Sequence, residues 1–193
     1  MRVIAGTARG RTLLGPPAGA ATRPTSDKVR EAIFNVLGDV SELRVLDLFA
    51  GTGAFGIEAL SRGAAHAVFV ESERKLCEII KKNLATVGLG DRATVLQRDV
   101  RRAGSHAAQH GPFELVFADP PYGHGLDAEA LAMLVRDKLL APSALVVVEH
   151  ASRDRVAVPA DAEATLTAEQ TRIYGDTALT CYRAPGASSD SHP

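Results

Sequence analysis

The stretch Asp47-Leu48-Phe49-Ala50-Gly51-Thr52-Gly53-Ala54-Phe55-Gly56 decides the fold of this 193-residue chain. Its first two residues are the end of an apolar run over 44–48, for which we predict a buried strand. Its last four residues are the beginning of the segment 53–62, for which we predict a helix. Gly51, Gly53 and Gly56 have the spacing G-x-G-x-x-G. Glycines at this spacing allow a tight strand-to-helix turn and a close approach of the backbone to a ligand. The stretch therefore predicts a nucleoside-binding glycine loop.

Strand and helix patterns alternate along the chain on either side of this loop. Helices are predicted from about Asp27 and over 53–62, 72–87 and 126–138, and strands over 44–48, 67–71, 93–97, 114–118 and 144–149. Such alternation predicts an α/β fold of the Rossmann-like class, with a mostly parallel sheet covered by helices on both faces. Two further strands over 164–172 and 178–183, joined by the turn Tyr174-Gly175-Asp176, should close the sheet as an antiparallel hairpin.

The composition excludes several classes of protein. Hydrophobic residues make up 46% and charged residues 23% of the chain, as in ordinary globular domains. We find no apolar run long enough to span a membrane and no apolar core of a signal peptide. Cys77 and Cys181 lie far apart and form no metal-type pair. We therefore expect a reduced, cytoplasmic protein, most simply a monomer, that holds no metal.

Basic residues gather near the N-terminus although the whole chain has a net charge of −1. Residues 1–30 have a net charge of +5, which favours a polyanionic partner. The basic residues concerned are Arg2, Arg9, Arg11, Arg23, Lys28 and Arg30. Residues 1–17 resemble a short hairpin with Val3 and Ile4 opposite 12–14. We divide the chain into this hairpin with its linker (1–22), a globular domain (23–184) and a disordered tail (185–193).

Three acidic residues near strand ends indicate the ligand of the glycine loop. Glu71 lies 20 residues after Gly51 and can accept hydrogen bonds from ribose hydroxyls. The glycine loop and Glu71 alone fit a dinucleotide as well as they fit S-adenosylmethionine. Asp47 would repel a pyrophosphate, but it suits a ligand that carries an amino group and a sulfonium. Asp99 after the third strand could accept from an adenine amine, or equally cap the next helix. These features favour S-adenosylmethionine over a nicotinamide cofactor.

The most specific motif is Asp119-Pro120-Pro121-Tyr122 at the end of the fourth strand. The prolines make a stiff corner that projects the Pro120 carbonyl beside the Asp119 carboxylate. Two acceptors held side by side match the two N–H groups of an exocyclic base amine. Tyr122 can stack on a base that has left its helix. The tetrad predicts methyl transfer to such an amine, provided that the first and fourth strands are neighbours.

Together these residues resemble the class I methyltransferase superfamily, and more closely the bacterial family of 16S ribosomal RNA guanine-N2 methyltransferases. The resemblance runs from about Arg2 to Arg183 and is most specific over 23–35, 47–63 and 119–122. It implies a seven-stranded sheet whose last strand is antiparallel, an RNA-binding N-terminal hairpin, and a wall of the cofactor pocket near Thr25–Asp27. It also implies that 16S RNA, within an assembling small subunit, is the partner. The stretch 101–112 matches no landmark of the family.

We accordingly expect three groups of functional residues. The catalytic residues are Asp119, Pro120, Pro121 and Tyr122. The residues around S-adenosylmethionine are Thr25, Asp47, Phe49, Gly51, Thr52, Gly53, Glu71, Ser72, Asp99 and Val100. The residues that contact RNA are Arg2, Arg9, Arg11, Arg23, Lys28 and Arg30.

Three alternatives stay open at this point. A DNA or RNA adenine-N6 methyltransferase could use the same tetrad, because any exocyclic amine has two donors. A nicotinamide-dependent oxidoreductase would explain the glycine loop and Glu71, but neither the tetrad nor the basic region. A non-catalytic RNA-binding protein would have no need of Asp119.

Overall fold

The computed structural model describes residues 1–17 and 27–187 of the chain. The helices are α1 (Asp27–Leu37), α2 (Ala54–Ser61), α3 (Arg74–Val87), α4 (Gly104–Ala107), α5 (Leu126–Arg136) and α6 (Ala160–Glu163), with 3-10 turns η1 (Gly90–Arg92) and η2 (Val100–Arg102). The strands are β1 (Arg44–Leu48), β2 (His66–Glu71), β3 (Ala93–Gln97), β4 (Phe113–Ala118), β5 (Leu140–Ala151), β6 (Thr167–Tyr174) and β7 (Thr177–Arg183).

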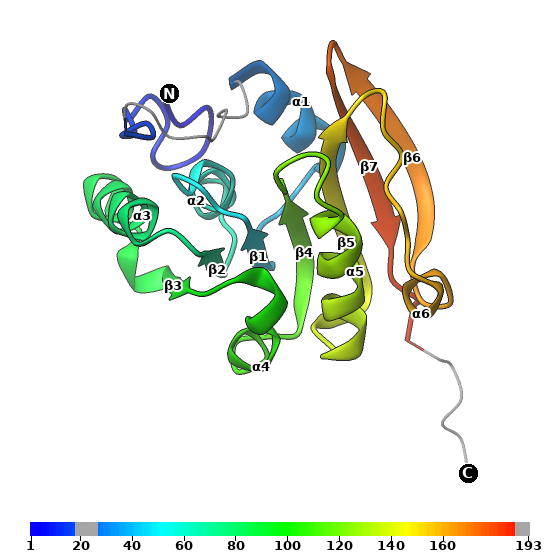
Figure 1. The fold of residues 1–193 in the computed structure, drawn as a ribbon. Helices are drawn as coiled ribbons and strands as arrows, with labels where there is room; N and C mark the ends of the chain where they lie inside the picture. The colour runs from blue at the N-terminus through cyan, green and yellow to red at the C-terminus, as the bar shows by residue number, and fades with distance from the viewer. Residues whose placement is uncertain (18–26, 188–193) are drawn as a thin grey trace.

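All seven strands form one sheet in the order β3-β2-β1-β4-β5-β7-β6 (Figure 1). The first five pair in parallel, and β7 runs antiparallel to both of its neighbours. This confirms the predicted Rossmann-like class and the closing hairpin. The strand order reverses at β1, because β2 lies on one side of it and β4 on the other. Ligands of open α/β sheets bind beyond the carboxyl ends of the strands at such a point.

Helices cover both faces of the sheet (Figure 1). Alternate residues of a strand point to opposite faces, so the central strands feed two separate apolar cores. On the face covered by α1, α2 and α3, Val45 and Phe69 are fully buried. On the face covered by α4, α5 and α6, Leu46 and Val68 are fully buried. These two cores hold the carboxyl ends of β1, β2 and β4 in fixed positions.

The N-terminal segment, residues 1–17, packs against the body of the protein. The predicted chain reversal is present, but it holds a single antiparallel bridge between Arg2 and Thr12 instead of two strands. Val3, Ala8 and Leu13 are buried in the core on the α2 side. The segment is thus continuous with the hydrophobic core that lies beneath the glycine loop.

Several predicted elements differ from the observed ones by one to three residues at their ends, and larger or more informative differences are the following. Helix α3 begins at Arg74 with Glu73 as its N-cap residue, so Ser72 does not cap it. Strand β5 is longer than predicted, because β4 and β7 pair with it on its two sides. The short helices α4 and α6 lie in stretches for which we predicted no helix. None of the described helices has the length and apolar character of a membrane span.

Candidate active site

The glycine loop joins β1 to α2 through residues with left-handed backbone. Phe49, Gly51 and Gly53 have φ angles of 57°, 55° and 78°. A Cβ at Gly56 would lie 2.4 Å from the Phe69 ring, so this position requires glycine to let α2 pack against β2. A Cβ at Gly51 would meet only one atom within 4 Å, at 3.9 Å. The loop is therefore packed tightly on its inner side and borders open space at Gly51.

Asp47 lies beneath this loop, almost completely buried. Its carboxylate accepts a hydrogen bond of 3.0 Å from the backbone N–H of Gly56. Burial raises the pKa of Asp47 to about 8, because the charged carboxylate is poorly solvated there. The observed contact is with the start of α2, and the contact of Asp47 with a ligand amine remains a prediction.

Glu71 at the end of β2 bridges two backbone turns. One carboxylate oxygen accepts from the Gly51 N–H at 2.8 Å and the other from the Glu73 N–H at 2.9 Å. Ser72 is exposed, and its hydroxyl donates a long hydrogen bond of 3.5 Å to the same carboxylate. The acid is thus held at the rim of the glycine loop, beside the open space at Gly51. Contact of this acid with a ribose remains a prediction.

The other predicted cofactor residues occupy different environments. Phe49 is partly buried against the core on the α5 side. Thr52 is buried, and its hydroxyl lies 4.0 Å from the sulfur of Met1. Its backbone carbonyl accepts a hydrogen bond of 3.0 Å from the side-chain amide of Asn83. Thr52 therefore connects the glycine loop to both α3 and the N-terminal segment.

Asp99 caps the turn η2 and forms an ion pair. Its carboxylate accepts from the backbone N–H of Arg101 at 3.0 Å and lies 2.6 Å from the guanidinium of the same residue. The hydrogen bond from the Arg101 side chain lowers the pKa of Asp99 to about 2. Of the two roles considered from the sequence, the structure shows the capping role. Val100 is buried in the core below it.

The tetrad follows β4 directly and lies beside the end of β1. Ala118 pairs with Leu48, and the Asp119 N–H donates to the Leu48 carbonyl at 3.5 Å. Asp119 is half-buried and Pro120 is buried, whereas Pro121 and Tyr122 are exposed. The condition set in the sequence analysis, that the first and fourth strands be neighbours, is therefore met, and the tetrad and the glycine loop leave the same edge of the sheet.

Tyr122 makes a contact that the sequence analysis missed. Its hydroxyl donates a hydrogen bond of 3.4 Å to Glu149, which lies near the end of the neighbouring β5 and is 5% exposed. Burial is the largest of the causes that raise the pKa of Tyr122 to about 12, so the phenol stays neutral. The ring itself remains 43% exposed. Glu149 directly follows the apolar run Val146-Val147-Val148. An acidic residue at the end of such a run was the signal that the sequence offered and that the sequence analysis did not use.

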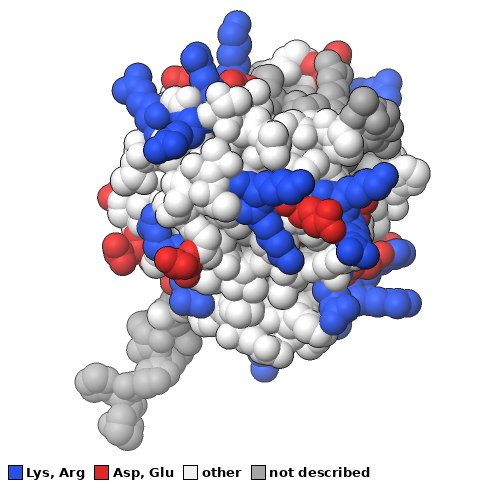
Figure 2. All heavy atoms as spheres, turned by 90° about the vertical axis from the view of Figure 1, so that its left-hand side faces the viewer, with Lys and Arg blue, Asp and Glu red and all other residues white. Residues whose placement is uncertain are grey.

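The predicted RNA-contacting residues divide into two groups. Arg2, Arg9, Arg11 and Lys28 are exposed, and Figure 2 shows groups of Lys and Arg side chains, with acidic ones between them, on the side of the molecule that carries α3 and the N-terminal segment. Arg23, like the predicted cofactor residue Thr25, lies outside the described residues.

Arg30 corrects our prediction, because it is buried and cannot reach RNA from this position. Its guanidinium donates to the carbonyl of Arg2 at 2.5 Å and to Asp27 at 3.0 Å. It also lies 3.9 Å from Glu58. Arg30 therefore attaches the N-terminal segment to the body of the protein.

Two polar residues missed at the sequence level hold the N-terminal segment in place. Glu58 in α2 accepts from the N–H groups of Ile4 and Ala5 at 2.8 and 2.9 Å. Asn83 in α3 bonds both the N–H and the carbonyl of Leu14. Each is a polar residue on a helix face that the apolar pattern marks as buried, and this was the available signal. In the part of the chain that the structure describes, no cluster of His, Cys, Asp and Glu is placed to hold a metal ion.

Comparison with known proteins identifies relatives along almost the whole chain. The family model described as conserved hypothetical protein 95 matches residues 1–183. The Bacillus subtilis protein YlbH is 39% identical over 188 residues, which are 96% of this chain and 100% of that protein. Ribosomal RNA small subunit methyltransferase D of Escherichia coli is 43% identical over 151 residues, 77% of this chain and 74% of that one. The structure of the Escherichia coli protein yhhF superposes with a TM-score of 0.79 at 38% identity, over 96% of this chain and 98% of that one.

Proposed function

Because the chain belongs to the family of small-subunit ribosomal RNA methyltransferases, we propose that it methylates the exocyclic N2 amine of a guanine in 16S ribosomal RNA. The observation that carries this proposal is the position of Asp119–Tyr122 at the end of β4, beside the glycine loop that follows β1. An acceptor site and a nucleoside site on adjacent strand ends are what a transfer between two bound molecules requires.

The residues of the loop fit S-adenosylmethionine as the methyl donor. Gly51 borders open space, and Glu71, which is 8% exposed, accepts from the Gly51 N–H directly beside that space. Asp47 lies below the loop, and a cationic ligand above it would favour its charged form. When bound, the cofactor supplies an electrophilic methyl group on a sulfonium. Glu71 would hold the ribose hydroxyls, and Asp47 would stabilise the positive charge of the methionine part.

The tetrad residues would orient the guanine amine. The amine is a poor nucleophile, because its lone pair is delocalised into the ring. The Asp119 carboxylate and the Pro120 carbonyl accept its two N–H groups, which draws the nitrogen toward tetrahedral geometry and aims the lone pair. The nitrogen then forms a bond to the methyl carbon as the carbon–sulfur bond breaks. After transfer the positively charged nitrogen would release one proton to solvent water, and the products would be N2-methylguanine and S-adenosylhomocysteine.

Tyr122 would stack on the extruded guanine. The hydrogen bond from its hydroxyl to Glu149 holds the far end of the exposed ring, so the direction of the side chain is restrained before the substrate arrives. Base–aromatic stacking contributes about 1–3 kcal/mol. Glu149 then acts as a positioning residue for the ring.

The exposed arginines of the N-terminal segment would contact RNA phosphates. Arg9 and Arg11 are exposed, and the segment that carries them is fixed by Glu58 and Asn83. A fixed basic surface can set the position of the RNA relative to the tetrad. We further propose that the substrate is an assembling small subunit in the cytoplasm and that the enzyme acts as a monomer.

The identity of the methylated nucleoside tests the proposed reaction. Unmethylated small subunits, or 16S RNA from a strain lacking the enzyme, should be incubated with labelled S-adenosylmethionine and digested to nucleosides for mass spectrometry. N2-methylguanosine is the expected product. N6-methyladenosine would keep the tetrad mechanism and overturn the proposed base, whereas the absence of label from RNA and DNA would overturn the function.

A further inference from the structure

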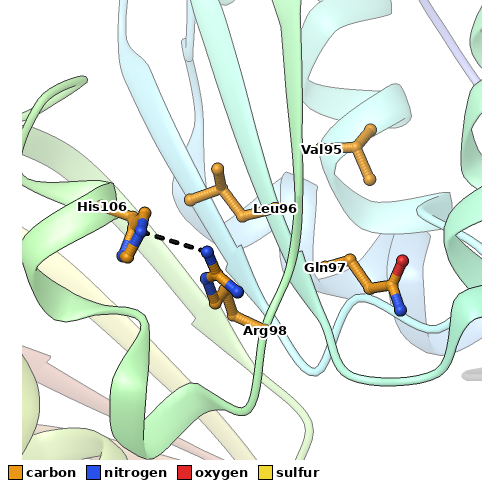
Figure 3. Close-up of a pocket in the computed structure, with 5 residues that line it drawn as sticks. All are labelled: Val95, Leu96, Gln97, Arg98 and His106. Carbon is orange, nitrogen blue, oxygen red and sulfur yellow. Dashed lines mark hydrogen bonds between the residues drawn. The ribbon is translucent and has the colours of Figure 1, made fainter.

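A groove lies at the free edge of the sheet, outside the site described above. Strand β3 pairs with β2 on one side only, and in the described chain its other side carries no strand. The groove has a volume of about 470 Å³ and is lined by Val95, Leu96, Gln97, Arg98 and His106. Figure 3 shows Leu96, Arg98 and His106 on one side of the strand and Val95 and Gln97 on the other.

The groove contains the positive charge of Arg98, which forms no ion pair within 4.0 Å with a carboxylate of the described residues. The Arg98 guanidinium contacts the His106 ring nitrogen Nε2 at 3.3 Å. A guanidinium has only donors, so the imidazole accepts and contributes no charge in this arrangement. Among the described residues, neither Arg98 nor the nearby Arg102 has a carboxylate within 4.0 Å, because Asp99 is paired with Arg101. Arg98 thus faces solvent in the groove beside a partly apolar strand edge, and Arg102 is a second exposed arginine four residues further along the chain, at the end of η2.

The groove adjoins the proposed reaction site without being part of it. Gln97 pairs with Glu71, and the Arg98 N–H donates to the Glu71 carbonyl. Arg98 therefore follows directly after the strand end that faces the proposed ribose site, while its side chain points along the outer edge with His106. RNA that reaches the tetrad over the strand ends would pass close to this edge.

We propose that this groove is a second RNA-binding surface, in which Arg98, together with Arg102 of the adjoining turn η2, contacts backbone phosphates of the strand that flanks the target nucleotide. A flanking nucleotide would lie against Leu96 and the His106 ring. The proposal rests on the function proposed above. It adds the path that the RNA strand next to the target nucleotide takes over the protein surface. Positive charge favours RNA over an added protein strand, since backbone pairing alone would need no arginine.

The test compares the double variant Arg98→Ala/Arg102→Ala with Arg172→Ala, an exposed arginine on β6 at the opposite edge of the sheet. Binding of a fluorescein-labelled single-stranded oligoribonucleotide is measured by anisotropy over a range of salt concentrations, and binding of S-adenosylhomocysteine by calorimetry. The double variant should bind RNA more weakly, and its log–log salt slope should fall by about 0.7 for each phosphate that it no longer binds. Its affinity for S-adenosylhomocysteine and the RNA binding of Arg172→Ala should stay at wild-type values.

Other outcomes separate the proposal from the function on which it rests. If Arg9→Ala/Arg11→Ala lowers the salt slope and Arg98→Ala/Arg102→Ala does not, the groove proposal is wrong and the function stands. Weaker S-adenosylhomocysteine binding by the groove variant would assign the groove to the cofactor site and overturn the proposal. The groove variant could also leave the salt slope of RNA binding unchanged while the mass of the wild type in sedimentation rises with protein concentration. That result would assign the free edge of β3 to contact with a second copy of the chain and overturn the proposal. A wild-type protein that binds no RNA would contradict both proposals.

Discussion

The side-chain amide of Asn83 donates a hydrogen bond of 3.0 Å to the backbone carbonyl of Thr52. The same side chain bonds the N–H and the carbonyl of Leu14, so one fully buried residue joins α3, the glycine loop and the N-terminal segment. The segment expected to contact RNA and the loop expected to contact the cofactor therefore share one support.

Replacing Asn83 with Ala should lower the free energy of unfolding by roughly 2–4 kcal/mol, because each buried polar group left without a partner costs about 1–3 kcal/mol. Urea denaturation followed by circular dichroism measures this. Thr86→Ala, at an exposed position of the same helix, is the control and should change stability by less than about 0.5 kcal/mol. Equal effects of the two substitutions would show that the Asn83 hydrogen bonds contribute little.

Glu71→Ala should weaken the binding of S-adenosylhomocysteine by roughly 1.5–3 kcal/mol, since a charged acceptor is removed from the ribose site. By affinity arithmetic this is about a tenfold to hundredfold rise in Kd, measurable by calorimetry. Part of the effect will come from the Gly51 N–H, which also loses its partner. Binding of NAD by the wild type, without binding of S-adenosylmethionine, would overturn the cofactor assignment.

The stability of the protein should depend on pH through Asp47. Its pKa rises from 3.8 to about 8 in the folded state, so the folded chain holds a proton that the unfolded chain has released. The contribution of this group to stability is therefore complete below about pH 4 and is lost as the pH rises to about 8. Asp47→Asn keeps an acceptor for the Gly56 N–H but does not titrate. Its unfolding free energy should fall less than that of the wild type between about pH 5 and about pH 8. If the unfolding free energies of the wild type and Asp47→Asn changed with pH in parallel, the Asp47 carboxylate would not be protonated in the folded protein.

Arg9 and Arg11 should act on RNA binding and Arg30 on stability. Arg9→Ala/Arg11→Ala should lower the log–log salt slope of RNA binding by about 0.7–0.9 for each phosphate that is no longer neutralised, with the affinity for S-adenosylhomocysteine unchanged. Arg30→Ala removes the side-chain donor to the Arg2 carbonyl, while Glu58 keeps Arg62 and the N–H groups of Ile4 and Ala5, so the unfolding free energy should fall by roughly 1–3 kcal/mol. A salt slope that stays at the wild-type value in Arg9→Ala/Arg11→Ala would mean that the N-terminal segment does not contact phosphates.

The sheet could be predicted from the sequence because its central strands are buried on both faces. The first strand has buried apolar residues at Val45, Leu46 and Leu48, and turn residues mark its ends. The same pattern occurs at 67–70 and at 115–118. The order of these strands could not be obtained from local patterns. The sequence analysis left the adjacency of the first and fourth strands as a condition, and the pairing of Leu48 with Ala118 meets it.

The missed interactions depend on long-range packing that local patterns do not report. Arg30 resembles the exposed arginines in sequence because its neighbours are charged, yet the N-terminal segment covers it and Glu58 lies below it. Glu149 reaches Tyr122 only because β5 lies beside β4. A polar residue at a position that the apolar pattern marks as buried was the common signal, and each of Glu58, Asn83 and Glu149 fits it.

The central claim is that Asp119 assists methyl transfer, and single-turnover kinetics with saturating S-adenosylmethionine and unmethylated 16S RNA test it most directly. The hydrogen bond to Asp119 strengthens as the amine nitrogen becomes tetrahedral and positive, so its removal should slow the transfer step more than it weakens binding. Asp119→Ala should transfer methyl groups on the order of a hundredfold more slowly than the wild type, with an unchanged affinity for S-adenosylhomocysteine. A wild-type rate of transfer in Asp119→Ala would show that the tetrad is only a structural corner and would contradict the mechanism.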